Sequence, residues 1–340
     1  MYNISRIITC ASFYGTGSSA VTDMLSEFDG ICSLGDYEYR FLQEPDGISD
    51  LEYNVVENNH RHNTSDAIKR FMKYMNNLEK MGYGGYDIFG GEFKRLTEQY
   101  VDEITELKSH SWWNKDRIDK GFVFCQIDRC YSLLKRIITR NLKTEKKFSL
   151  LQGREYGYYT AVTEEEFLDA TRRFIRNLFD YVNTENFPFI MVDQMVPATN
   201  SVRFCRYFDD IRIIAVERDP RDLYLLEKEI WQWGVIPVET VEEFVSWYKI
   251  TRKYANQKFD KPDTILRIRF EDLIYDYDNA KDKLISFIGI SKDAHARPRT
   301  KFNPDISIRN TNVMRQISGY ESDINYIEKH LSDYLYNFNS

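Results

Sequence analysis

The chain has 340 residues, a length that suits one large domain or two small ones with a substantial buried core. Its 46 lysines and arginines against 53 aspartates and glutamates give a net charge of −7, which argues against a nucleic-acid partner because phosphate binding needs a basic patch. Apolar residues make up 42% of the chain and charged residues 29%, which argues against a disordered or fibrous protein.

The amino terminus has no long apolar segment. Its short apolar run over residues 7–11 is far below the length of a signal peptide's hydrophobic region or of a membrane-spanning helix. We therefore expect a cytoplasmic protein without a membrane span. The five cysteines are an odd number without a CxxC pair or nearby histidines, and they predict buried reduced thiols and no metal site.

The first predicted elements are a buried parallel strand over residues 6–11 and a helix over residues 18–28. The strand is a short β-branched run that ends at a turn, and the helix has apolar residues at helical spacing with Gly30 as its stop. The loop between them is rich in glycine and hydroxyl groups: Ser12, Phe13, Tyr14, Gly15, Thr16, Gly17, Ser18 and Ser19. A short second strand is predicted after the helix, ending before Gly35.

This strand, loop and helix predict an anion site. Backbone N–H groups and hydroxyls of the loop can converge on a phosphate or sulfate at the positive end of the helix. The alternative is a tight turn whose glycines only permit the backbone geometry. A Walker A loop needs a lysine before its last serine or threonine, and residues 17–19 have none, so ordinary ATP or GTP hydrolysis is not expected.

Residues 50–186 have a different pattern. Long amphipathic stretches, for example over residues 65–78 and 163–182, predict a mainly helical insertion. No linker marks a boundary between independent domains, and we predict a single domain over residues 1–340 that contains this insertion.

The carboxyl-terminal half alternates strands and helices. Buried strands are predicted over residues 187–192, 210–216 and 264–270, and helices over residues 219–233 and 241–254. Thr240 and Glu243 have the spacing of a capping box at the start of the second helix. This alternation indicates an α/β fold, with a P-loop-like parallel β-sheet flanked by helices.

A second candidate anion ligand follows the predicted strand over residues 210–216. Arg218 stands at the carboxyl end of that strand, where ligands of open α/β sheets bind. Its guanidinium suits bidentate contact with a phosphate. The structural alternative is an ion pair of Arg218 or Arg221 with Asp222.

Together, the two motifs resemble those of sulfotransferases that use 3′-phosphoadenylyl sulfate (PAPS). Residues 14–19 are similar to the family's loop for the 5′-phosphosulfate, and residues 218–222 to the strand end whose arginine binds the 3′-phosphate. Residues 265–273 and 284–290 are similar to a further strand and helix of the family, which we expect to be structural. The resemblance covers residues 6–30 and 187–290.

The resemblance implies a sulfotransferase that moves a sulfuryl group from PAPS, without a metal, to an acceptor hydroxyl on a small molecule or a glycan. The insertion would then form the acceptor or lid region. Its aromatic residues would stack on a glycan, among them Trp112, Trp113, Tyr156, Tyr158 and Tyr159. The implied cofactor-binding residues are Tyr14, Gly15, Thr16, Gly17, Ser18, Ser19, Arg218 and Arg309.

The resemblance also implies a catalytic base, a glutamate or histidine, for which Glu38 is the candidate. A carboxylate takes this role when burial raises its pKa toward neutrality. The alternative is a surface pair between Glu38 and Arg40, and His60 and His62 are competing bases.

The chain departs from the family at two positions. Gly15 stands where many members have a lysine or arginine that stabilises the transferring sulfuryl group, and Arg40 or Lys94 would have to replace that cation. Leu226 stands where the family often has a serine. Two other functions therefore stay open: a P-loop-like kinase, and a non-catalytic nucleotide-binding protein. The sequence predicts no oligomeric state.

Overall fold

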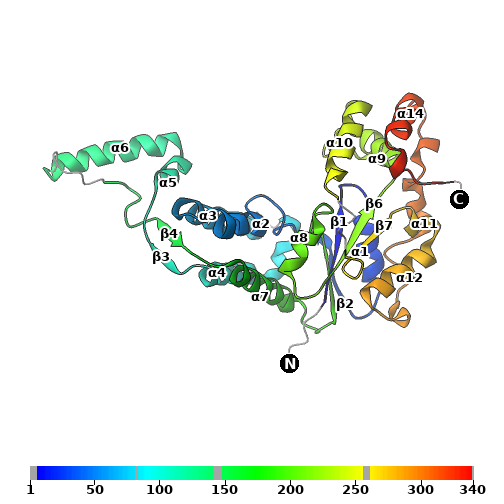
Figure 1. The fold of residues 1–340 in the computed structure, drawn as a ribbon, viewed down its shortest axis with the longest axis horizontal. Helices are drawn as coiled ribbons and strands as arrows, with labels where there is room; N and C mark the ends of the chain where they lie inside the picture. Colours follow the sequence, from blue (N-terminus) through cyan, green and yellow to red (C-terminus); the bar gives the residue numbers. More distant parts are fainter. Residues whose placement is uncertain (1–5, 82, 141–147, 256–260, 339–340) are drawn as a thin grey trace. The chain divides into compact units, whose positions relative to one another are not determined.

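The computed structural model describes residues 6–81, 83–140, 148–255 and 261–338. The chain forms two compact units (Figure 1). Unit 1 comprises Met1–Gln43, Gly82–Gly90 and Ile175–Ser340, and unit 2 comprises Glu44–Met81 and Gly91–Phe174. The single domain over residues 1–340 stays a prediction.

Unit 1 contains a parallel sheet. Its strands have the order β2-β5-β1-β6-β7 among the described residues, and every neighbouring pair is parallel. The strands are β1 (Arg6–Ser12), β2 (Ile31–Glu38), β5 (Phe189–Asp193), β6 (Ile211–Glu217) and β7 (Ile265–Arg269). This architecture confirms the predicted α/β fold, because the β-branched runs pair side by side as buried strands.

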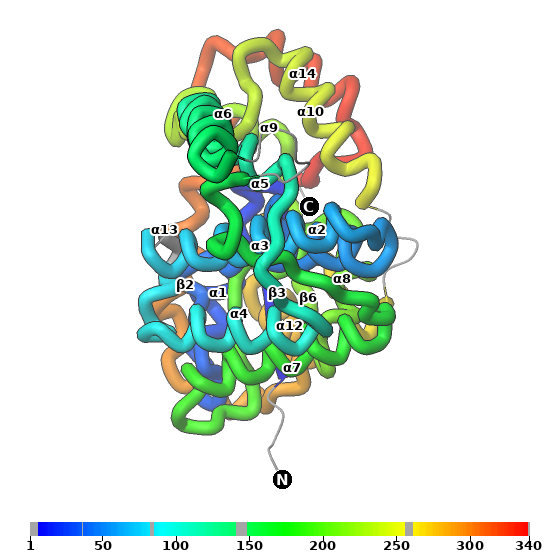
Figure 2. The backbone as a smooth tube through the Cα atoms, turned by 90° about the vertical axis from the view of Figure 1, so that its left-hand side faces the viewer, coloured from blue at the N-terminus to red at the C-terminus, as the bar shows by residue number. Residues whose placement is uncertain are grey.

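Two helices pack on the sheet through a shared apolar core (Figures 1 and 2). They are α1 (Ser18–Ser26) and α12 (Tyr277–Ile288). Val21 of α1 and Leu284 of α12 are fully buried with Ile8 of β1. Burying each such side chain contributes about 1.5–3 kcal/mol, so this core fixes the start of α1 against the end of β1.

A second apolar core in unit 1 joins α9 (Pro220–Leu225), α10 (Val241–Lys253) and α14 (Glu321–His330). The capping box predicted by Thr240 and Glu243 is present at the start of α10. The other described helices of unit 1 are short: η2 (Tyr83–Phe89), α8 (Ser201–Phe204), η3 (Cys205–Tyr207), η4 (Leu226–Trp231), α11 (Asp272–Tyr275), η6 (Lys292–Ala294), α13 (Pro304–Ser307), η7 (Ile308–Asn310), η8 (Val313–Arg315) and η9 (Ser332–Tyr334).

Unit 2 is mainly helical. A core of aromatic rings holds it together, in which Tyr100 stacks on Phe174 and meets Phe71 and Phe167 edge to face. Its helices are α2 (Ile48–Glu52), η1 (Tyr53–Glu57), α3 (Arg61–Met81), α4 (Glu92–Glu103), α5 (Asn114–Asp119), α6 (Gly121–Ile138) and the first part of α7 (Glu164–Val182). It also contains two antiparallel strands that the sequence did not predict, β3 (Leu107–His110) and β4 (Tyr156–Tyr159).

One predicted boundary is wrong. The sequence ends the second strand before Gly35, whereas β2 continues to Glu38. A shift in register after Ser33 lets Glu38 pair with Asp193 of β5, so the strand resumes past the irregularity. Among the described residues, no helix has the length and apolar character needed to cross a membrane.

Candidate functional site

The loop between β1 and α1 has a left-handed backbone at three positions. The φ angles are 67° at Tyr14, 62° at Gly15 and 98° at Gly17. Gly17 is the N-cap of α1, and no side chain caps the helix there. The first-turn N–H groups of a helix have no intrahelical acceptors, so this end of α1 suits an anion.

Two aromatic side chains explain why the loop needs glycine. A Cβ atom on Gly15 would lie 2.6 Å from Cζ3 of Trp231, and one on Gly17 would lie 2.5 Å from Cδ2 of Phe270. Such contacts are too short for carbon atoms, so both glycines are required by space as well as by backbone angle.

The hydroxyl groups of the loop hold the loop itself. Thr16 is buried, and its Oγ1 donates to the carbonyl of Val216 at 2.7 Å and accepts from the N–H of Phe13 at 3.3 Å. Ser18 Oγ donates to Asp193 Oδ2 at 3.2 Å. These bonds fasten the loop to the carboxyl ends of β6 and β5, whereas Ser19 is exposed.

Arg218 connects the two sequence motifs. Its Nη1 donates to the carbonyl of Gly15 at 3.1 Å, and its Nη2 donates to the carbonyl of Asn310. The guanidinium carbon lies 4.4 Å from the ring centroid of Phe270 and 5.3 Å from that of Trp231. Arg218 is 3% exposed, and burial lowers the pKa of its guanidinium below the ordinary value.

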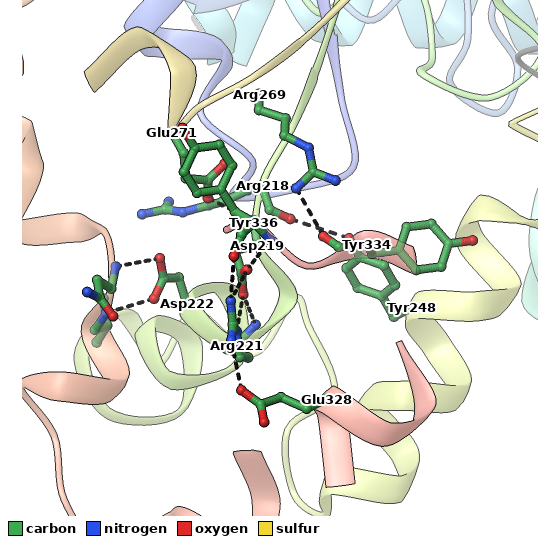
Figure 3. A network of polar contacts seen from close by, with 12 residues as sticks. Arg218, Asp219, Arg221, Asp222, Tyr248, Arg269, Glu271, Glu328, Tyr334 and Tyr336 are labelled. Atoms are coloured by element: carbon green, nitrogen blue, oxygen red, sulfur yellow. Dashed lines mark hydrogen bonds and ion pairs between the residues drawn. The ribbon is translucent and has the colours of Figure 1, made fainter. Parts of the chain in front are cut away.

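The other charged residues of the second motif have structural partners (Figure 3). Arg221 makes two hydrogen bonds to the carboxylate of Asp219 and one to Glu328. Asp222 instead accepts from the backbone N–H groups of Asn312 and Val313, each at 2.7 Å. The alternative of a pair between Arg221 and Asp222 is therefore wrong, because Asp219 and Glu328 take the guanidinium.

The bonds to Asp222 bring the carboxyl-terminal segment beside Arg218. Arg309 is exposed in this segment, one residue before the Asn310 carbonyl that Arg218 contacts. Glu271 Oε1 accepts from the N–H of Asp219 at 2.8 Å, and burial raises the pKa of Glu271 to about 7. Arg218 is thus surrounded by buried polar groups that fix its position.

A cavity of about 310 Å³ opens next to the loop in unit 1. Arg40 lies on its wall, with its guanidinium carbon 5.3 Å from the ring centroid of Tyr14 and its Nε donating to Glu38 at 2.9 Å. The lining mixes aromatic, aliphatic and uncharged polar groups with this one arginine: Ser12, Phe13, Tyr14, Arg40, Gln43, Gln194, Pro197, Ala198, Thr199, Ile250, Thr251 and Tyr254. Arg40 therefore places a cation beside the loop, which has none of its own at position 15. Lys94, the other cation considered, belongs to unit 2.

The predicted base, Glu38, is not buried. Its side chain is 51% exposed and forms the pair with Arg40 that the sequence offers as the alternative. The burial expected for a catalytic carboxylate is found at the neighbouring Asp193, which is 4% exposed. Burial first, and the charge of Glu38 second, raise the pKa of Asp193 to about 8.

Polar side chains link Asp193 to the cavity. Its Oδ2 accepts from Ser18, and Oδ1 has no partner among the described residues. Gln194 Nε2 donates to Ser18 Oγ at 2.9 Å and to Ser12 Oγ at 2.6 Å. Since Ser12 and Gln194 line the cavity, a continuous set of hydrogen bonds runs from its wall to the buried carboxyl.

Asp193 predicts a pH-dependent stability. The folded chain keeps a proton at Asp193 that the unfolded chain releases near pH 4, so stability should fall as the pH rises from about 4 to 8. In Asp193→Asn, the decrease in the free energy of unfolding between pH 5 and pH 8 should be smaller by about 2–4 kcal/mol. Urea unfolding of both proteins at several pH values measures it. Parallel pH profiles would show that Asp193 titrates normally.

The aromatic residues proposed to stack on a glycan lie in unit 2. Trp113 stacks on His62, with ring centroids 3.9 Å apart, and Tyr156 stacks on His110 at 4.3 Å. Both rings are more than 40% exposed, whereas Tyr158 is buried. In the part of the chain that the structure describes, no group of three or more His, Cys, Asp or Glu side chains is arranged to hold a metal ion.

No protein-family model and no curated protein matches the chain. Among solved structures, it is similar to a sulfotransferase domain from the curacin biosynthetic pathway, with 10% identity over 96% of this chain and 97% of that one, and a TM-score of 0.43. For the sulfotransferase domain of the Synechococcus PCC 7002 olefin synthase, the identity is 11% over 98% and 95%, with a TM-score of 0.42. For the sulfotransferase STF1 from Mycobacterium tuberculosis H37Rv, the identity is 9% over 91% of this chain and 77% of that one, with a TM-score of 0.35. These three solved structures are sulfotransferases, and the motifs of this chain resemble those of the same family.

Proposed function

We propose that the chain is a sulfotransferase that binds PAPS at residues 14–19 and transfers its sulfuryl group to an acceptor hydroxyl. The observation that supports this most is the contact of Arg218 with the loop, which joins two motifs about 200 residues apart at one place. Both motifs have the chemistry of an anion site, and their meeting favours a single site for a doubly anionic donor.

The surroundings of Arg218 suit a bound anion. Buried guanidinium groups usually have a carboxylate partner, because an unpaired buried charge is costly. Arg218 instead donates to two uncharged carbonyls, and its buried Nε has no partner among the described residues. The nearby carboxylates of Asp222, Glu271 and Asp219 favour its charged form, and a phosphate beside it would add a charged hydrogen-bond acceptor.

The remaining cofactor-binding residues have distinct roles in this proposal. The N–H groups of Tyr14, Gly15, Gly17 and the first turn of α1 donate to the phosphosulfate, while Thr16 and Ser18 hold the loop in place. Ser19 contributes its exposed hydroxyl. Arg309 contributes an exposed cation from the carboxyl-terminal segment that Asp222 fixes.

In the transfer step, the acceptor oxygen attacks the sulfur in line with the bond to the departing phosphate. Glu38 accepts the proton of the attacking hydroxyl, and Arg40 stabilises the negative oxygens of the sulfuryl group in place of a loop lysine. The acceptor occupies the 310 Å³ cavity that Arg40 and Tyr14 line. A cavity of this size suits a small molecule or one terminal sugar.

One observation favours a second candidate function. The loop has no lysine or arginine at position 15, and the side chains of Trp231 and Phe270 pack directly against Gly15 and Gly17. A nucleotide-binding protein without transfer activity would have the same features. Such a protein would bind 3′,5′-bisphosphoadenosine but transfer no labelled sulfate from PAPS to any phenol, alcohol or sugar. A kinase would instead turn over ATP in the presence of Mg²⁺.

Replacing Arg218 tests the donor site. Arg218→Ala should weaken binding of 3′,5′-bisphosphoadenosine by about 1.5–3 kcal/mol, which is about 10- to 150-fold, because a charged hydrogen bond is lost. Calorimetry measures the affinity. Arg212→Ala is the matched control, because Arg212 lies at the opposite end of β6 and bonds to Asp210. Equal affinities of the two folded variants would contradict the assignment.

A further inference from the structure

Helix α6 leaves its apolar side chains uncovered. Of its 18 residues, the one buried is the carboxylate Asp128. Seven large apolar side chains of this helix are 53–77% exposed: Phe122, Val123, Ile127, Leu133, Leu134, Ile137 and Ile138. Monomeric proteins rarely expose so many apolar side chains together, because their contact with water is unfavourable.

A polar anchor holds α6 within unit 2 and leaves the opposite side of the helix free. Asp128 Oδ1 accepts from Ser149 Oγ at 3.0 Å and from the N–H of Leu150 at 2.6 Å. Asp128 Oδ2 lies 3.8 Å from Nη1 of Arg117. The helix is thus fixed through a buried carboxylate rather than through its apolar face.

The exposed residues follow the spacing of a coiled coil. Val123, Ile127, Cys130, Leu134 and Ile137 are separated by alternating steps of four and three residues, and all five are exposed. This is the a/d pattern of a seam that a second helix fills with knobs-into-holes packing. At 100° per residue, Asp128 lies about 140° from the centre of this seam, so the anchor does not obstruct it.

We propose that α6 forms a two-helix interface with α6 of a second copy of this chain. The positions that flank the seam are uncharged: Phe124, Gln126, Tyr131, Leu133 and Ile138. In coiled coils, charges at these flanking positions usually set which helices pair. Because these positions are uncharged in α6, two identical helices meet without repulsion between like charges. The charged side chains of Arg129, Lys135 and Arg136 lie on the opposite side of the helix.

The seam is also nearly symmetric about Cys130. Val123 and Ile137 lie seven residues before and after it, and Ile127 and Leu134 lie three before and four after. A two-fold symmetric dimer requires such a self-complementary surface. If each of the seven apolar side chains exposes about 100 Å², the patch is close to the roughly 800 Å² that each partner contributes to a standard interface.

The oligomeric state of the full chain tests this proposal. Sedimentation equilibrium should give twice the 40.5 kDa of the chain for the wild type. The double variant Ile127→Glu with Leu134→Glu should raise the dissociation constant of the dimer at least about 100-fold, because four charges enter the apolar seam. The control, Arg129→Glu at an exposed position of α6 outside the seam, should leave it unchanged.

Cys130 provides a second measurement. A mild oxidant should join two chains through their Cys130 thiols, because the centre of the seam meets itself in either helix orientation. Cys130→Ser should abolish this product, and Cys32→Ser should not. Circular dichroism of each variant is measured to confirm that its secondary structure matches that of the wild type.

Three outcomes would overturn the proposal. They are a monomeric wild type at the highest soluble concentration, a dimer that the seam variant does not weaken, and a monomer that floats with anionic lipid vesicles, which would make α6 a membrane-surface helix. None of these outcomes bears on sulfate transfer.

Discussion

Substituting Gly17 by valine is expected to reduce the affinity for 3′,5′-bisphosphoadenosine at least about 100-fold and to leave the secondary structure intact. The φ angle of 98° is unfavourable for valine, and its Cβ would lie 2.5 Å from the Phe270 ring. Phe270 contacts the Arg218 guanidinium, so a displaced ring moves both parts of the proposed donor site. Calorimetry of the purified variant measures the loss.

Gly30 offers the matched control for this substitution. Its φ angle of 86° is also left-handed, but the nearest atom to an added Cβ belongs to Pro188 at 3.9 Å. Gly30→Val therefore introduces the backbone strain without the close contact, at a position outside the loop. If both folded variants bind the nucleotide equally well, residues 14–19 are only a turn.

The strands β1, β5, β6 and β7 could be predicted because each is a short, mainly apolar run that ends at a turn or polar residues. Burial on both faces makes such strands almost uniformly apolar, and this pattern depends on the local sequence alone. β2 was predicted too short because its second part, Gly35–Glu38, is polar and pairs after a register shift with β5. That pairing depends on a strand about 150 residues away, so the local pattern does not show it.

The motif residues of the site were found from the sequence, but their neighbours were not. Trp231 and Phe270 pack on the loop glycines from η4 and from the end of β7, and no local spacing relates them to the loop. Arg252 lies with its guanidinium carbon 4.3 Å from the Phe13 ring and 3.4 Å from the Tyr248 ring. In the sequence it is a basic residue in the last turn of a helix, which is common for reasons unrelated to binding.

Glu38→Gln is expected to lower the turnover of sulfate transfer by about 10²- to 10⁴-fold, the usual contribution of a positioned base. The amide keeps an oxygen that accepts from Arg40 but cannot take a proton. Donor affinity should change little, because Glu38 contacts neither the loop nor Arg218 among the described hydrogen bonds. Transfer of label from PAPS, measured with an acceptor found by screening, gives the rate.

Asp193→Asn is the comparison that makes this result specific. Asp193 is the other carboxyl group beside the loop, and the charge of Glu38 helps to keep it protonated near neutral pH. Glu38→Gln should therefore lower the pKa of Asp193 and flatten the pH dependence of stability, whether or not Glu38 is the base. A normal rate in Glu38→Gln together with a large loss in Asp193→Asn would contradict the assignment of Glu38 and point to the ionised form of Asp193 as the base.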